Sequence, residues 1–184
     1  MRFGTAALAA LTVFAVAGCD SSGGEQPPSS AASATSSALA QTVPTGFRPC
    51  DDIPADVLES ERLRNKRTDD NSASGGVIWS GCAWTQPDGY AATIQTTNIT
   101  VDLVRGKKFT DARELDIGGR QAISTRQVDA HPEAACTVNL ALKGGSLEVN
   151  LSNPPSRKNT GNLDTCELAK ALVAKIAPVI PTGA

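Results

Sequence analysis

The chain has 184 residues, of which 40% are hydrophobic and 20% are charged, and its formal net charge is −2. A chain of this length can form one domain of ordinary size with a core of its own. The balanced charge gives no basic excess of the kind that nucleic-acid binding needs, so we expect no nucleic acid among the partners.

The first 18 residues have the pattern of an export signal. Arg2 supplies a positive charge, and residues 3–17 form a mostly apolar run, as in secretory signals. The run stops at Asp20, whereas a membrane-spanning helix needs about 20 apolar residues. We therefore predict that residues 1–18 are a lipoprotein signal peptide and not a transmembrane anchor.

Cys19 is predicted to carry lipid. It follows Val16-Ala17-Gly18, and small residues before a cysteine at this point are typical of a lipobox. Each buried CH2 of an acyl chain contributes about 0.8 kcal/mol, and anchoring becomes stable with more than one chain. We expect palmitate-type lipidation and a location on the extracytoplasmic face of the cell membrane. The alternative is an ordinary signal peptide with a chance cysteine near the cut.

Residues 19–46 are predicted to be a lipidated, disordered tether. They are mostly Ser, Ala, Gly, Thr, Gln and Pro, with almost no large apolar side chains. Such a stretch cannot bury enough apolar surface to offset the entropy of ordering it. A single exported domain is then expected over residues 47–181.

The first half of this domain is predicted to hold a short helix followed by a hairpin. Residues 77–85 and 90–97 alternate in polarity as half-buried strands do, and Gln86-Pro87-Asp88-Gly89 between them has turn chemistry. Before them come a helix at 54–60, a weak strand candidate at 63–68 and a polar, Gly-rich loop at 69–76.

The second half is predicted to hold more strands and a final helix. Residues 100–105 fit either a strand end or a helical turn. A second hairpin turns at Gly144-Gly145, and Asp164 and Glu167 form a capping-box pattern before an apolar stripe at helical spacing. Leu115-Asp116-Ile117 leads into a turn at Gly118-Gly119. The remaining elements are strands at 121–127, 136–143 and 147–151, and a helix at 165–177. The stripe of that helix comprises Ala169, Leu172, Val173 and Ile176.

This order of elements predicts an α+β domain. It would have an antiparallel sheet of about five to six strands, with an N-terminal short helix and a C-terminal amphipathic helix packed on it.

Four cysteines remain after Cys19, namely Cys50, Cys82, Cys136 and Cys166. An even number in an exported domain predicts disulfides. Three connectivities are possible, and we favour Cys50–Cys82 with Cys136–Cys166, because each bond then closes a loop of about 30 residues. On this pairing each bond would staple a helix to the sheet. The alternative of a metal site is weak, since there is no CxxC spacing and His131 is the only histidine. We expect no metal and no cofactor.

Several short motifs occur in a characteristic order along the chain. They are the lipobox at Cys19, the Ser/Thr/Pro tether, Phe47-Arg48-Pro49-Cys50-Asp51, Gly81-Cys82-Ala83-Trp84, Ala135-Cys136-Thr137-Val138, and Cys166 in a terminal helix. Together they resemble the actinobacterial lipoproteins with a domain of unknown function 3558, which include LprB and LprC. The resemblance covers nearly the whole exported domain. It implies an envelope lipoprotein with paired cysteines and implies no catalytic residue.

No pattern of catalytic residues emerges. His131 lies before Pro132 in a polar loop, and no GxSxG, HExxH, P-loop or GxGxxG motif is present. The carboxylate pairs Asp51-Asp52 and Asp69-Asp70 are interpreted as solvated or capping groups. We expect no enzyme activity.

Trp79 and Trp84 fall on opposite faces of one predicted strand. We expect one to pack in the core and the other to offer a possible surface contact for a partner. The favoured function is a non-catalytic binding or assembly module, held at the membrane by lipid on Cys19 and engaging an envelope protein. The alternatives are a carrier of a small or lipidic ligand and, less favoured, a hydrolase.

Overall fold

The computed structural model describes residues 39–109, 111–128 and 130–184. The predicted signal peptide, Cys19 and the tether up to residue 38 lie outside the described residues.

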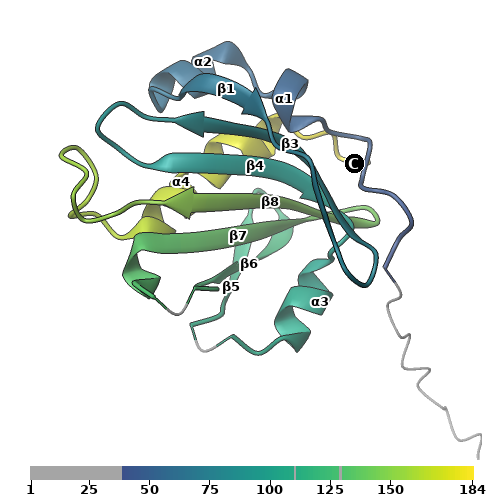
Figure 1. Cartoon of the computed structure of the whole chain (residues 1–184). Coiled ribbons are helices and arrows are strands. Elements are labelled where there is room, and N and C mark those ends of the chain that lie inside the picture. The colour runs from purple at the N-terminus through teal and green to yellow at the C-terminus, as the bar shows by residue number, and fades with distance from the viewer. Residues whose placement is uncertain (1–38, 110, 129) are drawn as a thin grey trace, which may run out of the picture. The chain divides into compact units, whose positions relative to one another are not determined.

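The described chain forms an antiparallel sheet with helices on both faces (Figure 1). The strand order is β1-β3-β4-β8-β7-β6-β5, and β2 also pairs with β3. The strands are β1 (Arg64–Thr68), β2 (Asn71–Ala73), β3 (Val77–Thr85), β4 (Ala91–Thr97), β5 (Arg113–Ile117), β6 (Arg120–Thr125), β7 (Ala135–Leu142) and β8 (Gly145–Ser152). The helices are α1 (Pro49–Asp52), α2 (Ala55–Ser60), α3 (Val101–Gly106) and α4 (Thr165–Ile176), with short 3-10 turns at Pro132–Ala134 and Ala177–Val179.

One face of the sheet and α4 enclose the main core. Alternate residues of β7 and β8 point to this face, and α4 packs on both strands with its predicted stripe. The residues from both layers that are fully buried at the centre are Val138, Leu140, Leu147, Val149, Ala169, Leu172, Val173 and Ile176. The predicted antiparallel sheet with a C-terminal helix packed on it is therefore confirmed, and the described domain is mostly sheet.

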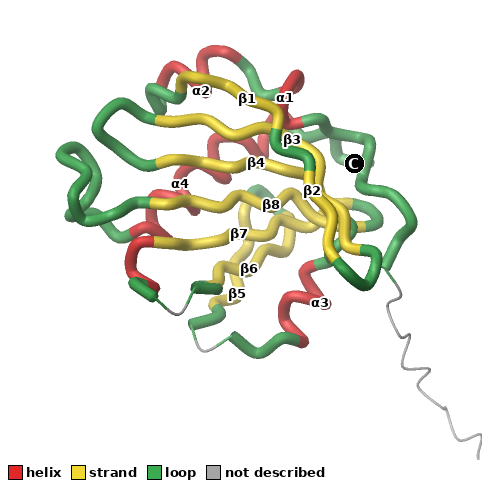
Figure 2. The backbone as a smooth tube through the Cα atoms, in the orientation of Figure 1, coloured by secondary structure: helices red, strands yellow, loops and turns green. Residues whose placement is uncertain are grey.

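The sheet has eight strands in the described part of the chain, so the prediction of five to six was wrong. The two strands that were missed are β2 and β5, whose residues are mostly exposed. They lack the apolar alternation that identifies a half-buried strand. Backbone pairing with a neighbouring strand, and not burial of their side chains, holds them in the sheet. Figure 2 shows β2 beside the first part of β3, where the two strands form a hairpin.

Residues 64–73, before β3, run along one edge of β3 as two short strands, β1 and β2, with a break between them. β1 pairs with the end of β3 and β2 with its start. Between them the Asp70 carboxylate accepts the N–H of Gly81 at 3.0 Å and the N–H of Asp69 donates to the carbonyl of Gly81 at 2.9 Å. A side chain therefore replaces a backbone acceptor where the pairing is interrupted.

The two disulfides are those predicted. Cys50 of α1 is bonded to Cys82 of β3 with a Cα–Cα distance of 5.3 Å, and Cys136 of β7 is bonded to Cys166 of α4 with a Cα–Cα distance of 5.1 Å. Each bond joins a helix to the sheet. At the start of α4, Asp164 caps the helix by accepting the N–H groups of Cys166 and Glu167. The Glu167 side chain does not complete a capping box, because it pairs with Lys170 one turn further on.

Residues 39–46, which the prediction assigns to the tether, contact the domain. The carbonyl of Ala40 accepts the Asn98 amide at 2.7 Å, and the same amide donates to Gly76 at 2.8 Å. Pro44 is buried next to Gly145. None of the described helices is long and apolar enough to cross a membrane.

Candidate functional site

The predicted site residues divide into two groups. Cys19 lies outside the described residues, and the four other cysteines are buried or half-buried in the two disulfides. Trp84 is in the main core with 2% of its surface exposed. Trp79 is only partly buried and lies on the other face of the sheet. The expectation that the two tryptophans lie on opposite faces is met.

His131 shows no catalytic arrangement in the described part of the chain. Its side chain is 81% exposed, and its ring nitrogen contacts only Glu133, at 3.2 Å. The carboxylates of Asp52 and Asp70 accept backbone N–H groups, at 2.7 Å from Arg48 and 3.0 Å from Gly81. Asp52 therefore has the predicted capping role at the start of α1, whereas Asp70 bonds a strand N–H and caps no helix.

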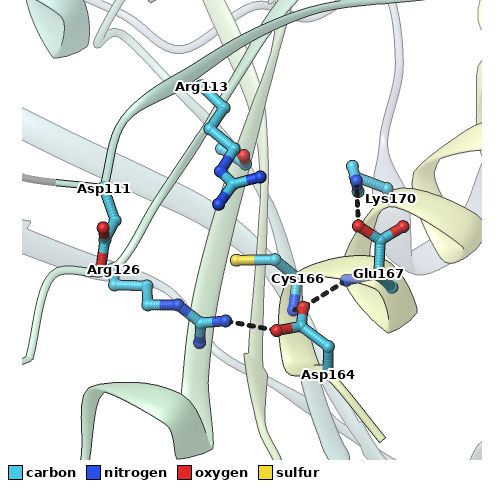
Figure 3. A pocket seen from close by; sticks show the side chains of 8 residues that line it. Asp111, Arg113, Arg126, Asp164, Cys166, Glu167 and Lys170 are labelled. Atoms are coloured by element: carbon cyan, nitrogen blue, oxygen red, sulfur yellow. Dashed lines mark hydrogen bonds and ion pairs between the residues drawn. The ribbon is translucent and has the colours of Figure 1, made fainter.

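A charged notch lies between β5, β6 and the start of α4, and Figure 3 shows its lining. Arg126 makes most of the hydrogen bonds in this notch. One end of its guanidinium donates to the carbonyls of Pro132, Glu133 and Ala135 at 2.8–3.2 Å, and the other end donates to Asp164 at 2.7 Å. Arg126 thus joins the 3-10 turn before β7 to the cap of α4.

The other charges of this notch are balanced. Asp111, Asp164 and Glu167 face Arg113, Arg126 and Lys170, and two of these cations are already paired with carboxylates. Partial burial of Asp164 is outweighed by hydrogen bonds from the Glu167 and Cys166 N–H groups and by Arg126, so the pKa of its carboxyl is lowered. We interpret the notch as a structural clamp, because it has no excess charge to attract a ligand.

The face of the sheet opposite α4 is polar at its centre. The strand register places Gln95 of β4, Glu148 of β8 and Asn139 of β7 side by side across this face. Gln95 and Asn139 have 6% and 0% of their surface exposed, although polar residues are rarely buried without partners. The row on three central strands thus has two buried amides and, between them, the partly buried carboxyl of Glu148, which is unusual for a face that could have been apolar or fully solvated.

Hydrogen bonds hold this row in place. Asn139 donates from its amide nitrogen to both Ser146 and Glu148 Oε2, at 3.1 Å each, and its amide oxygen has no partner in the described chain. Ser146 donates to the carbonyl of Ile99 at 2.7 Å, just before α3. Gln95 reaches past Gly81 to the carbonyl of Asp69, and a Cβ at Gly81 would lie only about 3.0 Å from the Gln95 side chain.

Helix α3 covers one end of the polar face and creates a pocket. The Thr100 hydroxyl caps the helix by accepting the N–H of Leu103 at 3.2 Å. Val101 and Val104 pack on Ile123 as a second, smaller apolar cluster. Beside that cluster is a pocket of about 120 Å³. Its apolar wall is formed by Ile99, Leu103, Val104 and Phe109, and the rest of its lining by Trp79, Glu148, Lys107 and Gln127.

Glu148 is the chemically distinctive residue of the pocket. Burial raises the pKa of its carboxyl above the usual value, and the nearby Asn139 amide and Trp79 indole oppose this rise without cancelling it. The indole N–H is buried, and no acceptor in the described chain is placed to form a hydrogen bond with it. We therefore regard Trp79 as a close neighbour of Glu148 and not as its donor. Within the same residues, no cation lies within ion-pair distance of Glu148.

Glu148, Asn139 and Lys107 were not predicted as site residues from the sequence. The alternation around 147–151 identified the apolar face of β8, and it left Glu148 on the other face without indicating that this face is also buried. That burial depends on the central position of β8 and on α3, neither of which a local pattern reveals. No group of three or more metal-ligating His, Cys, Asp or Glu side chains occurs in the described ranges.

Comparison with known proteins gives one match. Residues 14–178 match the family described as Protein of unknown function (DUF3558). No curated protein and no solved structure matches the chain.

Proposed function

Since the chain belongs to the DUF3558 family, whose function is unknown, we propose its role from the site itself: it is a non-catalytic binding module of the cell envelope. Its contact surface is the polar face of the sheet together with α3. The partner is an envelope protein that this surface engages on the extracytoplasmic side of the membrane.

The observation that carries the proposal is the Glu148 pocket. A largely buried carboxyl without an ion-pair partner in the described chain lowers stability, and perturbed carboxyls of this kind are concentrated at functional sites. The pocket opens beside the partly buried Trp79, and tryptophan is enriched at the energetic centres of interfaces. A ligand group entering this pocket would bury the apolar wall and compensate the carboxyl.

Two observations favour binding over catalysis. The His131 side chain is 81% exposed and contacts Glu133, and all four cysteines of the described chain are in disulfides, which leaves no thiol nucleophile there. Acyl or phosphoryl transfer needs a nucleophile beside a base, or donors aimed at a developing charge. Glu148 alone offers neither arrangement.

A lipid carrier is less well supported. Such a carrier needs an apolar cavity large enough for an acyl chain, and the layer between the sheet and α4 is filled by fully buried side chains such as Leu147, Leu172 and Ile176. The pocket under α3 has a volume of only about 120 Å³, below the roughly 300 Å³ at which ordinary ligand pockets begin.

The location follows from the lipobox. Val16-Ala17-Gly18-Cys19 and the resemblance to actinobacterial lipoproteins such as LprB and LprC support lipid attachment at Cys19 and an anchor in the cell membrane. Two disulfides in one domain also fit an oxidising compartment. Uptake of labelled palmitate by the wild-type chain and its loss in Cys19→Ala test the anchor; equal labelling of both would contradict it.

Photo-crosslinking in cells tests the binding surface. The crosslinking amino acid p-benzoylphenylalanine is placed at position 107, at the mouth of the pocket, and in a control at position 174, an exposed residue of α4. We expect a discrete crosslinked protein from position 107 only. The same product from both positions, or none from 107, would argue against this surface.

A further inference from the structure

The pocket under α3 combines an apolar wall with a single acidic group. The wall is formed by Ile99, Leu103, Val104 and Phe109. Glu148 is the only carboxyl among the described residues that line the pocket. Its volume of about 120 Å³ is slightly smaller than the engineered cavity of about 150 Å³ that admits benzene. The pocket therefore fits a group of about five heavy atoms, and a larger molecule only in part.

The electrostatics of the pocket select the sign of the occupant. Glu148 Oε2 accepts one hydrogen bond, from Asn139, and no cation in the described chain neutralises the carboxylate. An entering anion would be repelled at short range, and a neutral apolar group would displace water and leave the charge less solvated. A cation would gain the full attraction of a partly desolvated carboxylate.

The Asn139 amide adds to this selection. Its hydrogen bond to Glu148 Oε2 favours the ionised form of the carboxyl, which is the form that binds a cation, and partly offsets the rise in pKa that burial causes. Trp79 lines the same pocket as Glu148, so its indole signal should respond to a group that enters.

We propose that this pocket binds an ammonium group carried on a short apolar stem, as in an alkylamine or the end of a lysine side chain. The ammonium would pair with Glu148, and the methylene stem would pack on Leu103, Val104 and Phe109. This inference rests on the proposed binding function and names its chemistry. The two possible sources of the group, a free amine and a lysine of the partner, are distinguished by the test.

Lys107 is the one cation among the described residues that line the pocket. It is exposed at the end of α3 and makes no ion pair in the described structure. An external ammonium would therefore meet a competing charge at the mouth. Removing that charge should leave binding unchanged or make it tighter.

The test titrates the full chain in detergent with n-butylammonium, using NMR of the 15N-labelled indoles. The chain has two tryptophans, so Trp79→Phe assigns the signal of Trp79. We expect a saturable shift of that signal, with a dissociation constant on the order of 1 mM for so small a ligand. n-Butanol, which has the same shape without charge, and butyrate should produce no saturable shift.

Variants give the test its specificity. Glu148→Gln should weaken butylammonium binding about tenfold or more, because the ion pair is removed, while Glu59→Gln, an equal charge change at an exposed residue outside the pocket, should not alter it. Lys107→Met should bind at least as tightly as the wild type. An equal response to butanol, a loss of less than twofold in Glu148→Gln, or a loss of binding in Lys107→Met would each overturn the proposal.

A parallel titration with Nα-acetyl-lysine methylamide identifies the source. Binding of this compound together with a crosslinked protein from position 107 supports a lysine side chain of the partner, whereas binding of butylammonium alone supports a free amine. Crosslinking without any response to butylammonium would overturn the ammonium chemistry and leave the binding function standing. Butylammonium binding without a crosslinked protein would contradict the protein partner only.

Discussion

The disulfides allow a quantitative prediction about stability. The two bonds close loops with sequence separations of 32 and 30 residues. In the chain-entropy model a loop of this length contributes about 3.6 kcal/mol to the free energy of unfolding at 25 °C. The loops do not overlap, so their contributions should add to about 7 kcal/mol, a large part of the roughly 5–15 kcal/mol that holds a typical domain together.

Urea denaturation followed by far-UV circular dichroism measures this contribution. We expect the pairs Cys136→Ala with Cys166→Ala, and Cys50→Ala with Cys82→Ala, to lower the midpoint by similar amounts, about 2 M each for a slope near 2 kcal/mol/M. Removing both thiols of a bond avoids an unpaired cysteine, and the wild-type chain treated with a reductant provides the control for all four substitutions.

If loop closure dominates, the two variants should lose nearly equal amounts of unfolding free energy, because the loops differ by only two residues. A midpoint shift below about 0.5 M for either pair, at the slope typical of urea, would refute it. A loss at one bond more than twice that at the other would also refute it, since local packing of α1 or α4 would then dominate.

Three further predictions concern the polar face and the clamp. The raised pKa of Glu148 means that its proton is held more tightly in the folded chain, so stability is lost as the pH rises above the ordinary carboxyl value of about 4.3. Glu148→Gln should therefore raise the urea midpoint at pH 7 and lose this advantage near pH 4. A variant less stable than the wild type at pH 7 would contradict the direction of the pKa shift. Gly81→Ala should cost about 1–3 kcal/mol, because its Cβ would lie 2.2 Å from the carbonyl oxygen of Ile94. Gly106→Ala, with no atom within 4 Å of the added Cβ, is the control in the same thermal or urea assay, and equal losses would exclude the steric cause. Arg126→Met should cost about 2 kcal/mol, since three carbonyls and Asp164 lose their donor; an unchanged urea midpoint would show that water replaces the guanidinium.

The parts of the fold that were predicted correctly have strong local patterns. The strands around Gly144-Gly145 alternate cleanly, and α4 has both an N-cap and an apolar stripe at helical spacing. The disulfide pairing followed from loop length because each bond joins elements close in sequence. In all these cases the information lies within about 30 residues of chain.

The missed parts depend on distant contacts. β2 is a strand only because β3 extends far enough to pair with it, and β5 only because β6 offers its edge. The short helix at residues 100–105 could not be separated from a strand end, since six residues with two buried valines fit either structure and only packing on Ile123 decides. The candidate site also depends on distant contacts, because Trp79 and Glu148 belong to β3 and β8, the strands on either side of β4.

The polar face is best understood through the cost of its burial. α3 covers Ile123 and Ala141 with apolar contacts, and extending such contacts over Asn139 and Glu148 would complete a conventional second core layer. Instead the chain places two imperfectly satisfied groups beside the apolar cluster under α3. They are the Asn139 amide, whose oxygen has no partner, and the Glu148 carboxyl, which has no ion-pair partner in the described structure. Each such group reduces stability by an amount comparable with a lost hydrogen bond. A binding role would account for this arrangement, because the group that enters the pocket would supply the missing charge. Glu148→Gln, which removes the charge, should accordingly stabilise the free chain and weaken binding. If Glu148 had only a structural role, the same variant would be less stable and would keep its butylammonium response.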